Sequence, residues 1–177
     1  MTDPILALDL ASRSGWALGV PGARPLSGSI RFAREGHSMA AHFAGCRDWL
    51  DAFVAVNKPR VVIFEAPIAP SFMIGHTTTT TARALLGLIG MVEGTLYGRG
   101  FDVREASVSD VRRFFLGSAR IKSKDAKAAT VRRCVELGWR PADDNAADAL
   151  ALWAYMISIL SPADGVKLLP LFGRTSA

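Results

Sequence analysis

The chain has 177 residues, half of them hydrophobic, so it can bury the core of one domain and is not an intrinsically disordered chain. Its two cysteines, Cys46 and Cys134, show neither metal-site spacing nor a disulfide framework, which favours a reducing compartment. The N-terminus lacks the pattern of a secretory signal, and the most apolar stretch, 146–160, is too short for a membrane span. We therefore expect a cytoplasmic protein with no membrane partner.

The first half of the chain predicts three short strands, a helix and a fourth strand. Residues 4–10, 16–20 and 26–32 are strand candidates separated by short turns, which is typical of an antiparallel meander. Apolar residues then recur at three- and four-residue spacing over 37–56, as in a helix. Residues 61–65 form a continuous apolar run, as expected for a central strand covered on both faces.

The second half is mainly helical. After a loop at 66–76, the pattern predicts a helix at 77–96, a strand at 101–105, and helices at 107–117, 123–138 (with Ser123 as a candidate cap) and, after a link at 141–144, 146–160. Residues 163–177 are expected to be a loosely held C-terminal tail. The order of elements indicates one α/β domain over residues 1–162, with a mixed sheet flanked by helices.

Four acidic residues stand where predicted strands end or the last helix begins: Asp9, Glu65, Asp144 and Asp148. A carboxylate beside a buried strand is costly to desolvate unless it is paired or binds a metal ion. Taken singly, Asp9 and Glu65 could belong to turns, and Asp144 could cap a helix. Together they supply the oxygen ligands that Mg²⁺ or Mn²⁺ prefers.

Positive charge is concentrated in one part of the chain. The segment from Arg99 to Arg140 holds eleven cations and five anions, a balance of +6 in a chain of net charge +5. Such clustering favours a polyanionic partner such as nucleic acid, although a pair of solvated surface helices would look similar.

Five stretches, in this order, resemble the motifs of one nuclease family. They are the Asp–turn–Gly–aromatic stretch at 8–17, Phe64-Glu65, the segment 106–117, the Gly-containing basic loop 117–124, and Asn145-Ala146-Ala147-Asp148-Ala149-Leu150. They are similar to motifs of the RuvC-type Holliday-junction resolvases, in the ribonuclease H-like nuclease superfamily. The resemblance covers about residues 4–160 and implies a ribonuclease H-like mixed five-stranded sheet.

The resemblance also implies a metal-dependent endonuclease that resolves four-way DNA junctions by paired nicks. Two Mg²⁺ ions, for which Mn²⁺ can substitute, would activate water and stabilise the leaving 3′-oxygen. Asp9, Glu65 and Asp148 would be ligands. The family's third acid lies three residues before the last, where this chain has Asn145, so we favour Asp144, four residues before Asp148, as the fourth ligand over Asn145.

Other roles follow from the same resemblance. Lys124 is chosen to offset charge on the transition state, with a simple phosphate contact as its alternative. A junction with two-fold symmetry implies a homodimer, for which the glycine-containing helix at 77–96 is a candidate interface. The residues expected to contact DNA are Arg13, Phe72, Arg112, Arg113, Arg120, Lys122, Lys124 and Lys127.

Three other functions were weighed. An actin-like ATPase needs two such domains and a second Asp-x-Gly motif, which this chain lacks. A nuclease for flaps, forks or RNA–DNA hybrids remains open, because a fold does not define a substrate. A catalytically weak junction-binding module also remains open, because Asn145 could mark reduced metal binding.

Overall fold

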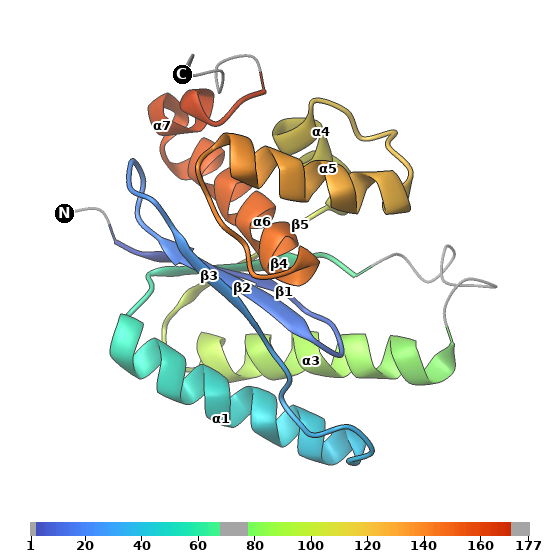
Figure 1. Cartoon of the computed structure of the whole chain (residues 1–177). Helices are drawn as coiled ribbons and strands as arrows, with labels where there is room; N and C mark the ends of the chain where they lie inside the picture. Colours follow the sequence, from blue (N-terminus) through green and yellow to red (C-terminus); the bar gives the residue numbers. More distant parts are fainter. Residues whose placement is uncertain (1–2, 68–77, 171–177) are drawn as a thin grey trace.

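A mixed sheet of five strands forms the centre of the molecule (Figure 1), in a computed structural model that describes residues 3–67 and 78–170. The strands are β1 (Ile5–Asp9), β2 (Ser14–Gly19), β3 (Leu26–Ile30), β4 (Val61–Glu65) and β5 (Asp102–Ala106). Their order across the sheet is β3-β2-β1-β4-β5. The first three pair antiparallel, whereas β4 lies parallel to both β1 and β5. The predicted meander and mixed five-stranded sheet are confirmed.

Helices cover both faces of this sheet (Figure 1). On one face lie α1 (Met39–Asn57) and α3 (Thr79–Tyr97), which pack against each other. On the other face, α6 (Asp144–Leu160) crosses β1 and β2, and α4 (Val108–Leu116), α5 (Ser123–Glu136) and α7 (Pro162–Lys167) pack around it. The α/β class is therefore confirmed.

The alternation of side chains along the central strands gives the molecule two cores. In β1, Ile5 and Ala7 face the α6 layer, and Leu6 and Leu8 face α1 and α3. All four are at most 1% exposed, so β1 is covered on both faces. A strand buried in this way can hold a charged residue only at its end, and that residue is Asp9.

The helix α6 is buried around most of its circumference, and Trp153 near its centre is 1% exposed. The most apolar stretch of the sequence, 146–160, is therefore a helix of the core. Among the helices in the described part of the chain, none is long and apolar enough to cross a membrane. Cys46 and Cys134 are both buried free thiols.

The structure differs from the sequence-based expectation after Pro162. A loosely held tail is wrong for residues up to Pro170, because α7 packs on α6 and Arg133 donates hydrogen bonds to the carbonyl oxygens of Leu168 and Leu169. The start of α5 also differs, because Lys122 rather than Ser123 occupies its N-cap position.

Candidate active site

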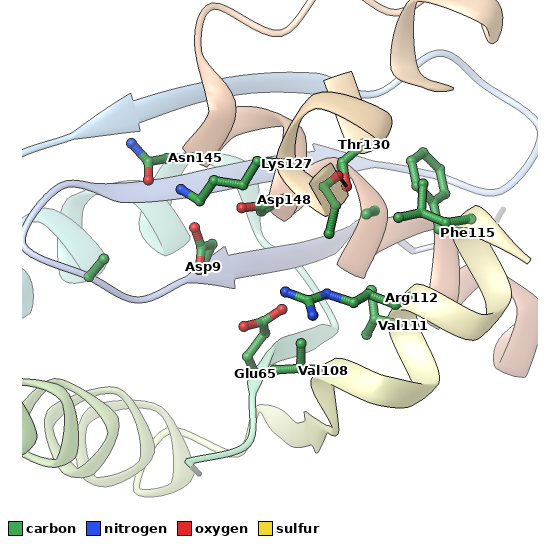
Figure 2. Close-up of a pocket in the computed structure, with 14 residues that line it drawn as sticks. Asp9, Glu65, Val108, Val111, Arg112, Phe115, Lys127, Thr130, Asn145 and Asp148 are labelled. Carbon is green, nitrogen blue, oxygen red and sulfur yellow. Dashed lines mark hydrogen bonds between the residues drawn. The ribbon is translucent and has the colours of Figure 1, made fainter. Parts of the chain in front are cut away.

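Three of the predicted acidic residues come together because of strand direction. Asp9 ends β1 and Glu65 ends β4, and these strands are parallel neighbours in a register that pairs Leu8 with Phe64. Their carboxyl ends therefore meet at one edge of the sheet. Asp148, in the second turn of α6, approaches the same edge from above the sheet (Figure 2). All three side chains line one pocket of about 470 Å³.

A close approach of backbone to backbone brings α6 to this edge. A Cβ atom added at Gly15 in β2 would lie 1.9 Å from the carbonyl oxygen of Asn145, so only glycine allows α6 to begin here. The Asp–turn–Gly pattern in the sequence thus supplies both the Asp9 carboxylate and the space for the helix that carries Asp148.

Asp143 fixes the start of α6, a role that the sequence interpretation did not assign to it. Its Oδ1 accepts a hydrogen bond of 2.9 Å from the backbone N–H of Ala146, which is an N-cap contact. The Oδ2 of Asp143 accepts a hydrogen bond of 2.6 Å from the hydroxyl of Ser29 on β3. The same oxygen lies 3.2 Å from Nε of Arg13, with which it forms an ion pair. The cap therefore ties the start of the helix to β3 and to the turn between β1 and β2. The signal for it was an Asp three residues before Ala146.

Burial and mutual repulsion hold the three pocket carboxylates in an unusual electrostatic state. Burial, followed by the charges of Glu65 and Asp148, raises the pKa of Asp9 to about 8. Burial, followed by the charge of Asp148, raises the pKa of Glu65 to about 7. Burial also raises the pKa of Asp148 to about 6. These carboxylates therefore lack enough positive charge nearby, which is the condition that a bound cation relieves.

The apolar wall of the pocket explains much of this desolvation. Side chains from α4, α5 and α6 face the carboxylates across the cavity: Val108, Val111, Phe115, Ala126 and Ala151. Val111 and Phe115 are also part of the core beneath α6. A rigid apolar wall limits how many water molecules can solvate the charges, so any compensation must come from cations.

Two cations reach the carboxylates from the helices. Figure 2 shows Arg112 of α4 extending toward Glu65 and Lys127 of α5 extending toward Asp9 and Asp148. The Nζ of Lys127 donates a hydrogen bond of 2.6 Å to Oδ2 of Asp144. This contact lowers the pKa of Asp144 and raises the pKa of Lys127.

Asp144 and Asn145 lie differently with respect to the pocket. Asn145 lines it together with Asp9 and Asp148, whereas Asp144 stands outside the lining and pairs with Lys127. Asn145 therefore lies at the pocket, three residues before Asp148 in the sequence. Our preference for Asp144 over Asn145 stays a prediction, and the structure shows what Asp144 does in its place, which is to bind a lysine.

The known proteins that resemble this chain are found among solved structures. No protein-family model matches it, and no curated protein matches it either. Among solved structures, it is similar to Thermus thermophilus RuvC at 13% identity and a TM-score of 0.64, over 89% of this chain and 97% of that one. The structure of T. thermophilus RuvC in complex with a Holliday junction substrate is 15% identical to this chain, with a TM-score of 0.66. The match covers 90% of this chain and 96% of that one. The yeast mitochondrial Holliday junction resolvase Ydc2 gives 13% identity and a TM-score of 0.59, over 85% and 76%.

This chain has the RuvC-type fold. The resemblance inferred from five short motifs is therefore confirmed at the level of the fold, over nearly the whole chain. At these identities the likeness shows the fold alone, so chemistry must be argued from this chain's own residues.

Some of the residues predicted to contact DNA line the pocket, and others lie outside its lining. Arg112 and Lys127 line the pocket. Arg120, Lys122 and Lys124 are exposed around the start of α5 and are absent from the lining. Among the rest, Arg113 pairs with Asp110 at 2.8 Å, Arg13 is held by Asp143, and Phe72 lies outside the described residues.

The donor set fits a divalent metal ion. Asp9, Glu65 and Asp148 offer carboxylate oxygens and Asn145 an amide oxygen, all of them hard ligands that suit Mg²⁺ or Mn²⁺. Over residues 3–67 and 78–170, however, no three acidic, histidine or cysteine side chains lie close enough as placed to hold one ion together. Shared binding of one ion would therefore require the side chains of these carboxylates to draw together.

Proposed function

We propose that this protein is a divalent-metal-dependent endonuclease that cuts branched DNA, with the four-way junction as its preferred substrate. The observation that carries the proposal is the pocket in which Asp9, Glu65 and Asp148 face one another with raised pKa values, at the carboxyl ends of β1 and β4. A cluster of desolvated carboxylates between basic helices suits a cation and a phosphodiester together better than either alone.

Each pocket residue has a proposed part. Asp9, Glu65 and Asp148, with Asn145 or Asp144, would hold divalent metal, which would lower the pKa of a bound water and polarise the phosphate. The water oxygen forms a bond to phosphorus, the bond from phosphorus to the 3′-oxygen breaks, and the proton lost by the water is balanced by one gained at the 3′-oxygen. The products are a 5′-phosphate and a 3′-hydroxyl. Arg112 and Lys127 would offset the charge that the phosphate brings into the pocket.

The exposed basic residues support a nucleic-acid substrate. Arg120, Lys122 and Lys124 are exposed just before or at the start of α5, and they are not among the described residues that form ion pairs within the chain. Positive groups without internal partners are available for backbone phosphates. Lys124 keeps its proposed place close to the transition state, although Lys127 stands nearer to the carboxylates.

A homodimer is part of the proposal because paired nicks in a two-fold junction need two matched pockets. The helix α3 offers one candidate surface, where Gly90 and Gly94 have open space around them and Leu86 and Tyr97 are exposed. Gly87 is different, since a Cβ there would lie 2.1 Å from the ring of Phe43, so this glycine serves packing against α1.

The test is direct. Purified protein is incubated with Mg²⁺ or Mn²⁺ in four parallel reactions, each with one substrate: a four-way junction, a flap, a linear duplex or an RNA–DNA hybrid. The proposal expects metal-dependent nicks that are fastest on the junction. Preference for the flap or the hybrid would move the function to another branched or hybrid substrate, and binding without cleavage at any metal concentration would show a junction-binding module.

A further inference from the structure

For Lys127 the sequence predicted only a contact with DNA, in common with several other basic residues. It lies on the first turns of α5, and its Nζ contacts Asp144 at 2.6 Å. In the described part of the chain, it is the one cation whose charge opposes the rise in the pKa of all three pocket carboxylates, Asp9, Glu65 and Asp148. A single ammonium thus acts on the whole cluster.

The charge of the cluster suggests what this ammonium replaces. The site contains four carboxylates and two cations, which are Asp9, Glu65, Asp144 and Asp148 against Lys127 and Arg112. When all four carboxylates are ionised, as metal binding requires, the formal balance is −2, which one divalent ion neutralises and two would exceed. Without Lys127 the balance would be −3, and Asp144 would become available as a ligand. A neutral Asn145 on the pocket wall also provides less charge for a second ion.

We propose that Lys127 takes the place of a second metal ion, so that the pocket holds one divalent ion and one ammonium. This inference rests on the proposed function. The ammonium provides three N–H donors and one positive charge, which suit a non-bridging phosphate oxygen and the departing 3′-oxygen.

The exposure of the Lys127–Asp144 pair makes this role physically accessible. The two side chains are 51% and 45% exposed, so solvent screens their attraction and the pair contributes little to stability. Lys127 can therefore leave Asp144 for a phosphate at low cost. Asp144 acts as a holding partner that keeps the ammonium near the pocket before DNA arrives.

Metal stoichiometry tests the proposal without reference to cleavage. Mn²⁺ is titrated into the DNA-free protein, and the loss of the free Mn²⁺ signal is followed by electron paramagnetic resonance. We expect one tightly bound Mn²⁺ per wild-type chain, one for Lys127→Arg, and two for Lys127→Met. Lys167→Met is the matched control, because Lys167 also pairs with an aspartate, Asp164 at 2.7 Å, on the distant helix α7. It should bind one ion like the wild type.

Single-turnover cleavage of a four-way junction supplies the second readout. Lys127→Met should cleave about 100-fold more slowly at low Mn²⁺, which is the usual order for loss of one donor to developing charge. Its rate should then recover at high Mn²⁺ with a steeper dependence on metal concentration than the wild type shows. Circular dichroism of each variant confirms folding.

Several results would overturn the proposal. Two tightly bound ions in the wild type would do so, and so would a single ion in folded Lys127→Met. Cleavage that continues at the wild-type rate in Lys127→Met would also do so. These results would leave the nuclease function standing if the wild type cuts junctions. A wild type that cuts none of the four DNA substrates would instead refute the proposed function.

Discussion

Replacing Asp9 by Asn should stabilise the metal-free protein, and the gain should grow with pH. Burial and neighbouring carboxylates raise the pKa of Asp9 from 3.8 to about 8. The folded state therefore holds a proton that the unfolded state releases between those values. Below pH 3.8 Asp9 is protonated in both states and does not reduce the free energy of unfolding. As the pH rises toward 8, the cost of burying the ionised carboxylate grows and the folded state becomes less stable. The side chain of asparagine does not titrate, so Asp9→Asn removes this loss of stability at high pH.

The magnitude follows from the size of the pKa change. A rise from 3.8 to about 8 corresponds to roughly 6 kcal/mol at about 1.4 kcal/mol for each pKa unit. Side-chain movement and water entry reduce such penalties in folded proteins, so we expect a gain of about 2 kcal/mol at pH 8.5 and little at pH 4.5. For a domain of this size, 2 kcal/mol raises Tm by roughly 4–8 °C.

Thermal unfolding with a chelator present, at pH values from 4.5 to 8.5, is the assay. Asp164→Asn is the control, because the partly buried carboxylate of Asp164 accepts hydrogen bonds from Lys167 and Ser161, which lower its pKa. It should not gain stability with rising pH. The reasoning would be refuted if Asp9→Asn raised Tm no more at pH 8.5 than at pH 4.5, or if it lowered Tm at pH 8.5.

Three further predictions concern the site and its surroundings. If Asp144 is a metal ligand, Asp144→Asn should cost far more junction cleavage than Asn145→Ala, and the reverse order in single-turnover rates would assign the ligand to Asn145. Asp143→Ala removes the N-cap of α6 and should lower stability by about 1 kcal/mol in chemical denaturation, whereas Asp143→Ser should restore most of it. Lys122→Ala should weaken junction binding and reduce the slope of log K against log salt by roughly 0.9, as for one lost phosphate contact. Lys124→Ala should in addition lower the rate at saturating protein, and an unchanged rate there would make Lys124 a phosphate contact only.

Much of the fold was predictable because its signals are local. The run from Val61 to Glu65 matches β4 residue for residue, since a strand buried on both faces must be apolar until it reaches the edge. The helix α7 was missed, although Ser161-Pro162 with Asp164 is a helix-start signal, because a six-residue helix has too few residues to show periodicity.

The acidic residues of the site could be predicted from the sequence, whereas the positions of its basic residues could be predicted less well. Strand ends and one helix start located Asp9, Glu65 and Asp148, because parallel neighbours must end at the same edge. Lys127 and Lys124 are both basic residues of one helix, and spacing alone does not tell which of them faces the carboxylates. That choice depends on how α5 packs against α6, which is set by long-range contacts. The approach of Gly15 to Asn145 has the same origin, since it joins residues far apart in the sequence.

The central claim is that the carboxylates of this pocket hold metal for phosphodiester cleavage. Single-turnover cleavage of a four-way junction in Mg²⁺, by the wild type and by Glu65→Gln and Asp148→Asn, tests it most directly, with junction affinity measured on the same preparations. We predict that the wild type cleaves and that each variant loses at least about 100-fold in rate. The variants should bind the junction as tightly or more tightly, because a negative charge facing phosphates is removed. Cleavage by either variant near the wild-type rate would contradict the assignment of that residue, and near-wild-type cleavage by both would contradict the account.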